Sequence, residues 1–198
     1  MMFQQPFIPT EKMIMERDFV NGSIVIGKGT ILEPYCAIYP RCVIGEKCII
    51  GTHAVLKEDT RVGDHSIIGT LTATEGNCSI GSWTTIHSQC HITEGLHIGN
   101  NVFIAPFFIS TNTPVLGKGR FGYPNTTNHP RFESYIHDGV RIGANVSIVP
   151  NITIGKDALI DMCCLITSDV PAGAHMRGDT SYVARYHEAI PNIDEESQ

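Results

Sequence analysis

Residues 24–110 repeat with a period of six, and this period constrains the fold more than any other feature of the chain. From Ile26 to Ser110, every sixth residue is aliphatic at thirteen of fifteen positions, and the exceptions are Thr74 and Ser110. Two residues before each of these positions stands a mostly small residue, often Cys, Thr, Ser or Ala. Helices repeat every 3.6 residues and simple strands every two, so a period of six indicates a solenoid of short strands and turns.

Each hexad is expected to form one short strand and one turn. Residues two apart on a strand point to the same side, so the aliphatic and the small residue both face inward. Three hexads close a triangular coil of about 18 residues, and only a stack of coils buries a core. The sequence therefore predicts an all-β fold, a parallel β-helix of about seven triangular coils. Glycine follows the aliphatic residue at corners where the backbone is expected to need a positive φ: Gly27, Gly45, Gly51, Gly63, Gly69, Gly81 and Gly99.

One repeat domain accounts for most of the 198 residues. We expect a lead-in without repeat over residues 1–23, the β-helix domain over 24–178 and a C-terminal tail over 179–198. Residues 111–135 break the hexad phase and are expected to form one long loop between coils. Loops of this length inside a compact domain are usually functional. Within the tail, residues 181–190 are expected to form one or two helical turns.

Composition excludes several classes of function. The net charge of −6 argues against nucleic acid as a main partner. No run of about 18 apolar residues is present, so no membrane span is expected, and the first residues lack the order of a signal peptide. Most cysteines occupy the small inward position, which predicts free buried thiols and a reducing, cytoplasmic location. These are Cys36, Cys42, Cys48, Cys78, Cys90 and Cys164.

The repeat resembles that of the hexapeptide-repeat acyltransferases. Within that family, ITEGLHIGNNVFIAPFFISTNT (92–113) and IHDGVRIGANVSIVPNITIGKDALI (136–160) are similar to nucleotide-linked amino-sugar N-acetyltransferases. Those enzymes carry a comparable block that ends in a triplet like Thr111-Asn112-Thr113. The resemblance implies a left-handed β-helix, a homotrimer and acetyl-CoA as the acyl donor. It also implies that the acceptor is the amine of a nucleotide-linked amino sugar.

Coil spacing places a candidate base beside the long loop. Acyl transfer from a thioester needs a base near the attacking amine. Residues one coil apart stack on each other, so Asn112 is expected to lie over Glu94 at one corner. His91 precedes an inward residue and points outward on the strand that leads to that corner. We therefore expect His91, Glu94 and Asn112 to share one outer edge, with a carboxylate fixing the tautomer of the histidine.

Three other histidines compete with His91 as the base. His87 is expected at another corner and His97 on the next face. His129 lies in the loop, in an Asn-His-Pro stretch that resembles those of galactoside and serine acetyltransferases. A further alternative uses no side chain, because the departing thiolate of the cofactor or water can take the proton.

The resemblance also implies where the donor binds, in a groove between two subunits beyond the loop. By position, the backbone of Gly143, Ala144 and Asn145 would meet the thioester end of coenzyme A. Lys156 and Arg177 would meet its phosphates, the first as a point charge and the second as a fork.

Other functions remain open at this point. One is acetylation of another small acceptor, such as serine or a free sugar. A second is a metalloenzyme like the γ-class carbonic anhydrases, in which three histidines hold a metal between subunits. No two of the nine histidines here are separated by one coil length, so none are expected to stack. A third is a scaffold subunit without catalysis, as in dynactin-like assemblies.

Overall fold

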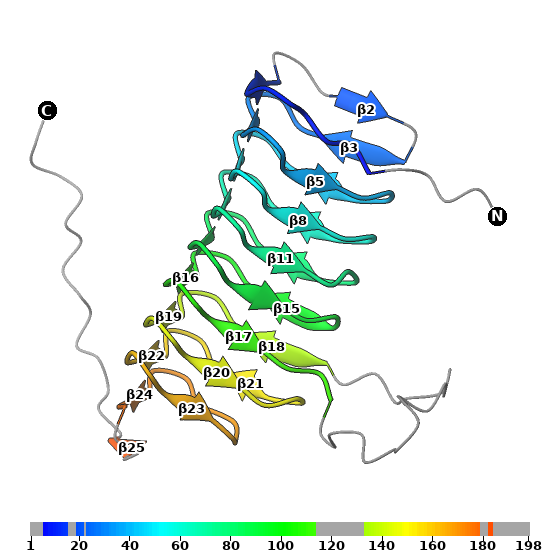
Figure 1. Ribbon diagram of the computed structural model, residues 1–198. Helices are drawn as coiled ribbons and strands as arrows, with labels where there is room; N and C mark the ends of the chain where they lie inside the picture. Colours follow the sequence, from blue (N-terminus) through cyan, green and yellow to red (C-terminus); the bar gives the residue numbers. More distant parts are fainter. Residues whose placement is uncertain (1–5, 16–18, 22, 114–132, 179–181, 184–198) are drawn as a thin grey trace, which may run out of the picture.

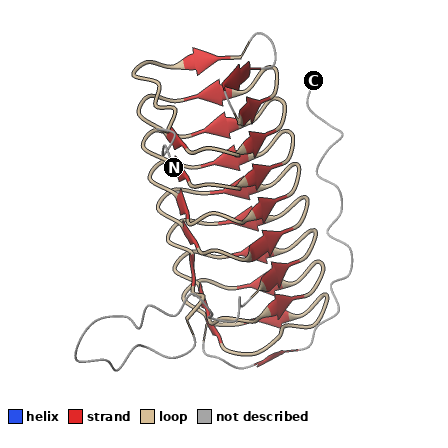
Figure 2. Ribbon diagram, turned by 90° about the vertical axis from the view of Figure 1, so that its right-hand side faces the viewer, coloured by secondary structure: helices blue, strands red, loops and turns tan. Residues whose placement is uncertain are grey.

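The chain forms a stack of coils built from 25 short strands (Figures 1 and 2). The computed structural model describes residues 6–15, 19–21, 23–113, 133–178 and 182–183. Three sheets run along the stack, and nearly all neighbouring strands in them are parallel. This arrangement confirms the predicted all-β fold, a parallel β-helix of triangular coils. In the described part of the chain, no helix is long and apolar enough to cross a membrane.

Successive strands of one coil belong to different sheets. Sheet A contains β5 (Ala37–Ile38), β8 (Val55–Leu56), β11 (Ala73–Thr74), β14 (His91–Ile92), β17 (Ile109–Ser110), β20 (Ser147–Ile148) and β23 (Leu165–Ile166). Sheet B contains β1 (Met13–Ile14), β4 (Ile31–Leu32), β7 (Ile49–Ile50), β10 (Ile67–Ile68), β13 (Thr85–Ile86), β16 (Phe103–Ile104), β19 (Arg141–Ile142), β22 (Leu159–Ile160), β24 (His175–Met176) and β25 (Tyr182–Val183). Sheet C contains β2 (Phe19–Asn21), β3 (Ile24–Ile26), β6 (Val43–Ile44), β9 (Arg61–Val62), β12 (Ser79–Ile80), β15 (Leu96–Ile98), β18 (Ser134–Ile136) and β21 (Thr153–Ile154).

The register of the parallel strands follows the predicted coil length, as in the pair Ser79↔His97. Between β15 and β18 the step along the chain is longer, because His97 pairs with Tyr135. The coil that contains the loop is therefore longer than its neighbours by the length of the insertion. Strand β18 begins at Ser134, just inside the predicted loop. Ser134 and Ile136 are both buried, so the hexad pattern already resumes there.

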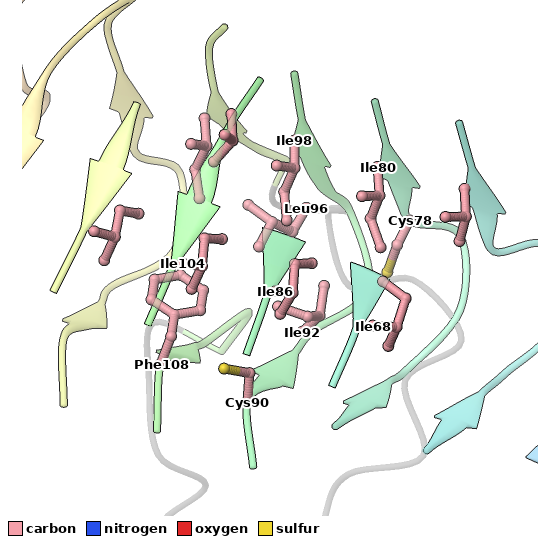
Figure 3. Close-up of a cluster of buried hydrophobic side chains, with 14 of the residues drawn as sticks. Ile68, Cys78, Ile80, Ile86, Cys90, Ile92, Leu96, Ile98, Ile104 and Phe108 are labelled. Atoms are coloured by element: carbon pink, nitrogen blue, oxygen red, sulfur yellow. The ribbon is translucent and has the colours of Figure 1, made fainter. Parts of the chain in front are cut away.

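Inward-facing aliphatic side chains fill the interior, as Figure 3 shows for the middle coils. The six cysteines predicted to face inward are buried, and all seven cysteines are free. Burial raises the pKa of the Cys36, Cys42 and Cys78 thiols to about 11. Cys163 alone among the seven is exposed. The prediction of buried thiols is confirmed.

Small inward residues also tie the coils together through hydrogen bonds. The Thr84 hydroxyl donates to the carbonyl of Gly99 at 2.8 Å and accepts the Val102 N–H at 3.2 Å. Ser66 repeats the arrangement one coil earlier, donating to Gly81 and accepting from the Thr84 N–H. Each such bond contributes about 1 kcal/mol, so this register needs hydroxyl groups as well as small volume.

The predicted reason for the corner glycines is wrong. Among the described residues, positive φ occurs three residues after the aliphatic position, at sixteen non-glycine residues that include Trp83 and Phe107. The corner glycines are required by close approach instead. A Cβ added to Gly81 would lie 2.5 Å from the carbonyl carbon and oxygen of Gly99 on the next coil. The coils stack so closely at this corner that no side chain fits between their backbones.

Antiparallel strands cover both ends of the stack. Strand β1 pairs with β4, β2 pairs with β3, and Phe7 bridges to Ile38, so the lead-in covers all three sheets of the first coil. Covering an open edge in this way protects a solenoid from edge pairing. At the other end, β25 pairs antiparallel with β24. Tyr182–Val183 is therefore a strand and not part of a helical turn, and residues 184–190 lie outside the described residues.

Candidate functional site

The three corners of the coil differ in the residue that comes directly after the aliphatic position. The chain passes from sheet C to sheet B, then to sheet A and back to sheet C, so we name the corners C/B, B/A and A/C. The C/B corner has glycine in five successive coils, at 27, 45, 63, 81 and 99. At the A/C corner, the same position holds a residue with a side chain in five successive coils: Tyr39, Lys57, Glu75, Thr93 and Thr111. The long insertion also leaves from this corner, between β17 and β18.

A histidine, a glutamate and an asparagine meet at the A/C corner. His91 points outward from β14, and its Nε2 lies 3.2 Å from Oε1 of Glu75. The other oxygen of Glu75, Oε2, accepts a long hydrogen bond of 3.5 Å from Nδ2 of Asn112. The His91 side chain is 43% exposed and that of Glu75 35%, so the imidazole remains accessible. The carboxylate thus bridges the candidate base and the first residues of the insertion.

The predicted edge is present, but the carboxylate that holds His91 is Glu75 and not Glu94. Oε1 of Glu94 accepts a hydrogen bond of 2.8 Å from Nδ2 of Asn77. Glu75 directly follows β11, the strand beside β14, so its side chain reaches sideways to His91. Glu94 lies further round the corner. Spacing by one coil length identified the corner correctly and selected the wrong carboxylate.

The two polar residues in the aliphatic register were the feature of the sequence that could have directed attention to the neighbourhood of Glu75. Thr74 and Ser110 lie on sheet A in the coils before and after His91, and both are buried. Thr74 comes immediately before Glu75, and its hydroxyl lies 2.8 Å from the hydroxyl of Thr60. The Ser110 hydroxyl accepts the Thr93 N–H at 2.9 Å and donates to the carbonyl of His91 at 3.2 Å. The Ser110 hydroxyl thus ties β17 to the backbone of the strand that carries His91.

The competing histidines lie elsewhere. His87 stands at the B/A corner, where its ring meets that of Phe103 edge to face at 5.5 Å. His97 projects from sheet C, with Nδ1 2.8 Å from Oγ of Ser79 and its ring stacked on Tyr135 at 5.1 Å. His129 lies outside the described residues.

The predicted thioester-binding segment follows β19 at the B/A corner. Coil stacking occupies two of its three amides, because Gly143 donates to Ile160 at 2.8 Å and Asn145 donates to Pro106 at 3.1 Å. Among the residues that the structure describes, the Ala144 N–H donates to no backbone carbonyl. This amide is the one of the three that can donate to a ligand.

The two predicted phosphate-binding cations are not brought together. Arg177 follows β24 at the B/A corner, on the same side as Gly143. Lys156 follows β21 at the C/B corner, where its Nζ lies 4.0 Å from Oδ2 of Asp157. Both side chains are exposed. In the described ranges, no three His, Cys, Asp or Glu side chains are arranged to hold a metal ion.

Comparison with known proteins places the chain in a family. Residues 14–117 match the family model described as the GMPPB C-terminal domain, and residues 133–168 match the bacterial transferase hexapeptide (six repeats). The first match covers more than half of the chain. The chain therefore belongs to the family of the GMPPB C-terminal domain, and the second match extends the hexapeptide repeat to its later coils.

Individual relatives cover less of the molecule. The chain is 34% identical over 61 residues to a 2,3,4,5-tetrahydropyridine-2,6-dicarboxylate N-acetyltransferase of Staphylococcus aureus. That stretch is 31% of this chain and 26% of the relative, so the chain spans about a quarter of the curated relatives it matches.

Similar solved structures support the fold. One is a variant of AntD, an N-acyltransferase from Bacillus cereus, in complex with dTDP and coenzyme A. It matches with a TM-score of 0.59 and 16% identity, over 70% of this chain and 84% of AntD. Another is a hexapeptide-repeat acetyltransferase from Vibrio cholerae with acetyl coenzyme A, with a TM-score of 0.55 and 22% identity over 64% of this chain and 71% of that one.

Proposed function

We propose that this chain transfers an acetyl group from acetyl-CoA to the amine of a nucleotide-linked amino sugar, with His91 as the base. The observation that carries this proposal is the hydrogen-bonded edge of Glu75, His91 and Asn112 at the root of the insertion. The names of the relatives agree with it, since the S. aureus relative is an N-acetyltransferase and AntD was solved with coenzyme A and dTDP.

The hydrogen bond to Glu75 sets the chemistry of the imidazole. With a carboxylate as acceptor, Nε2 of His91 carries the proton and Nδ1 keeps a free lone pair. Nδ1 takes a proton from the acceptor amine as its nitrogen attacks the thioester carbonyl. A C–N bond forms, the C–S bond breaks, and the thiolate of coenzyme A takes up a proton as it leaves. The Glu75 carboxylate stabilises the imidazolium between these steps.

The donor is proposed to bind on the outer face of sheet A, toward the B/A corner. His91 lies on that face, and Gly143, Ala144, Asn145 and Arg177 stand at that corner. The free amide of Ala144 suits the thioester end, and the exposed Arg177 suits a phosphate. Lys156 stands at another corner, so it is farther than Arg177 from a donor bound to the same subunit.

The B/A corner is also proposed as the contact between copies of the chain in a homotrimer. Large exposed apolar side chains recur along it, including Tyr35, Leu71, Phe107 and Met162, each about half exposed or more. Exposed large apolar side chains that gather on one edge favour a protein contact there. With these corners around a common axis, sheet A of one subunit would face its neighbour. The free buried cysteines support a cytoplasmic location for the assembly.

The proposed base is tested by replacing it. We expect His91→Ala to lower kcat by about 10²-fold or more, because the amine must then lose its proton without a positioned base. The affinity for acetyl-CoA, measured by calorimetric titration, should remain nearly unchanged. His65→Ala is the matched control, because His65 stands at the C/B corner, away from the proposed donor residues, where its ring stacks on that of Trp83 at 4.0 Å. This variant should keep full turnover.

Two outcomes would contradict the proposal. Unchanged turnover in the His91→Ala protein would remove His91 as the base. Failure of the wild-type chain to bind acetyl-CoA at all would reject the donor half of the reaction.

A further inference from the structure

The outer face of sheet C carries a row of polar side chains in the middle of the stack. Arg61, Ser79, His97 and Tyr135 occupy the same outward position on β9, β12, β15 and β18, and the register pairs each with the next. Val43 precedes the row in the same position on β6. Neighbouring strands lie about 4.8 Å apart, so Arg61 and His97 stand on strands about 10 Å apart with Ser79 between them.

The later members of this row are already held in place. Oγ of Ser79 lies 2.8 Å from Nδ1 of His97, and the imidazole stacks on the ring of Tyr135 at 5.1 Å with 24° between the planes. The Tyr135 hydroxyl donates to the Glu133 carboxylate. Within the described residues, Nδ1 is the ring nitrogen of His97 that is hydrogen-bonded, so Nε2 can face a ligand. Groups fixed before binding lose less entropy when a ligand arrives.

Arg61 is the cation of this row, and Asp59, two residues earlier in the chain, is paired with a different arginine. Nε and NH2 of Arg41 donate to the two carboxylate oxygens of Asp59 at 2.8 and 2.7 Å. This bidentate pair leaves the exposed Arg61 guanidinium without a hydrogen-bonded carboxylate among the described residues. Lys57 and Glu58 lie in the same segment, so Arg41 and residues 57–61 together carry three positive and two negative side chains.

No other lysine or arginine lies near in sequence on the C-terminal side, because none occurs from Val62 to Gly117. Arg61 is thus the last positive charge before the coils that carry His91. Two other acids border the row, and each accepts a hydrogen bond, Glu94 from Asn77 and Glu133 from Tyr135.

We propose that Arg61, Ser79 and His97 form a seat for a phosphate group of the acceptor, the diphosphate of a nucleoside diphosphate-linked sugar. When the Ser79 hydroxyl donates to Nδ1 of His97, Nε2 carries the ring proton. The Arg61 guanidinium and this N–H are then donors suited to phosphate oxygens, and Ser79 orients the ring. This inference rests on the proposed function, and it names the residues of this chain that bind the nucleotide part of the acceptor.

Position on the coil assigns the seat to the acceptor and not to the donor. His91 and His97 are one hexad apart in the same coil, on either side of the A/C corner. An acceptor that places a phosphate at His97 must therefore pass round this corner to bring its amine to His91. The proposed donor residues, such as Ala144 and Arg177, stand at the B/A corner, on the far side of sheet A.

Calorimetric titration of the full chain tests the seat without turnover. The probes are UDP, GDP and dTDP in one arm and coenzyme A in the other, so that the two sources of phosphate are separated. We expect Arg61→Ala to weaken the best nucleoside diphosphate by at least about tenfold, and Ser79→Ala by about threefold. Coenzyme A binding should stay within twofold. Lys47→Ala is the matched control, because it removes an exposed cation at the C/B corner, and it should change neither ligand.

The other outcomes either overturn the seat or separate it from the proposed function. If the wild type binds no nucleoside diphosphate, the seat is rejected. Equal losses of affinity in Arg61→Ala and Lys47→Ala would show only a general effect of charge. A loss of coenzyme A affinity in Arg61→Ala would assign the residues to the donor. If nucleotide binding depends on Arg61 but the chain transfers no acyl group, the seat stands and the proposed function is rejected. If the chain transfers an acyl group but binds no nucleotide, the proposed function stands and the seat is rejected.

Discussion

In the proposed reaction, Glu75 determines which nitrogen of His91 acts as the base. Its two oxygens contact His91 and Asn112, so one carboxylate fixes the imidazole and also holds the root of the insertion. We expect Glu75→Gln to lower kcat by at least about tenfold, because an amide can hold the imidazole in either tautomer. Acetyl-CoA affinity should be unaffected, and Glu75→Asp should restore part of kcat. Glu94→Gln is the control, and an equal loss there would show that charge at the corner matters more than the contact with His91.

Buried thiols make stability depend on pH in the alkaline range. Burial raises the pKa of Cys36, Cys42 and Cys78 from 9.0 to about 11. Below pH 9 both the folded and the unfolded chain keep these protons, and their contribution to stability is fully present. Between pH 9 and 11 the unfolded chain loses them first, so each thiol lowers the free energy of unfolding by about 1.4 kcal/mol per pH unit.

Urea denaturation at pH 8 and pH 10 measures this slope. Cys36→Ala should show a shallower loss of stability between the two values than the wild type, whatever its stability at pH 8. Cys163→Ala, at the exposed thiol, should keep the wild-type slope. Equal slopes in all three proteins would contradict the role of burial.

At the same scale, the sequence predicted which residues face inward but not which side chains meet. His91, Glu94 and Asn112 were assigned to one edge from spacing alone, and that edge exists. The contact between His91 and Glu75 joins positions that are closer in sequence than one full coil, so stacking by coil length does not select it. It depends on how far each side chain reaches at the corner, and a repeat in the sequence does not contain that information.

Among the elements, the turn at the C/B corner tolerates the addition of a side chain least. A Cβ on Gly81 would lie 2.5 Å from backbone atoms of Gly99, and that backbone can move only if the coils separate. We expect Gly81→Ala to lower the free energy of unfolding by about 1–3 kcal/mol, as overpacking does in other cores. Lys57→Ala, in the same register at the A/C corner, should change it by less than about 0.5 kcal/mol. A chemical denaturation series measures both, and equal small effects would show that the C/B corner can open.

The strands and the positions of the turns could be predicted from the hexad, because six residues are enough to determine each of them. The turns nevertheless differ from expectation, since left-handed backbone falls on residues such as Leu71 and Trp83. A side chain at such a position costs about 1–2 kcal/mol, and ladder hydrogen bonds to the adjacent coils offset this cost. The strain is therefore set by stacking between coils, which local propensity does not report.

Considered as a whole molecule, the stack has two features that the period did not predict. The lead-in returns as antiparallel strands over the first coil, and the tail does the same at the other end. Both arise from the need to cover the exposed edges of a solenoid, which exists only once the coils are stacked. The position of the insertion could be predicted because it interrupts the phase, whereas residues 114–132 within it lie outside the described residues.

The proposed trimer contact at the B/A corner can be tested with a single charge. Phe107 is 48% exposed there, and Leu71 stands in the same register two coils earlier with Gln89 between them, so apolar side chains recur along this corner in alternate coils. In a closed trimer with this corner near the axis, a carboxylate at position 107 would face its two copies, and these like charges would disfavour the contact. We expect the wild type to have a mass of about three times 21.7 kDa by light scattering, and Phe107→Asp to have the mass of one chain.

Trp83→Asp is the matched control for this experiment, because Trp83 is an aromatic residue in the same backbone conformation, 62% exposed, at the C/B corner. It should leave the mass unchanged. A trimer that survives Phe107→Asp and dissociates with Trp83→Asp would place the C/B corner at the axis. Sheet C would then lie inside the assembly, where Arg61 could meet a nucleotide only through a groove between subunits. The mass measurement therefore also decides whether the proposed phosphate seat opens to solvent or to a neighbouring chain.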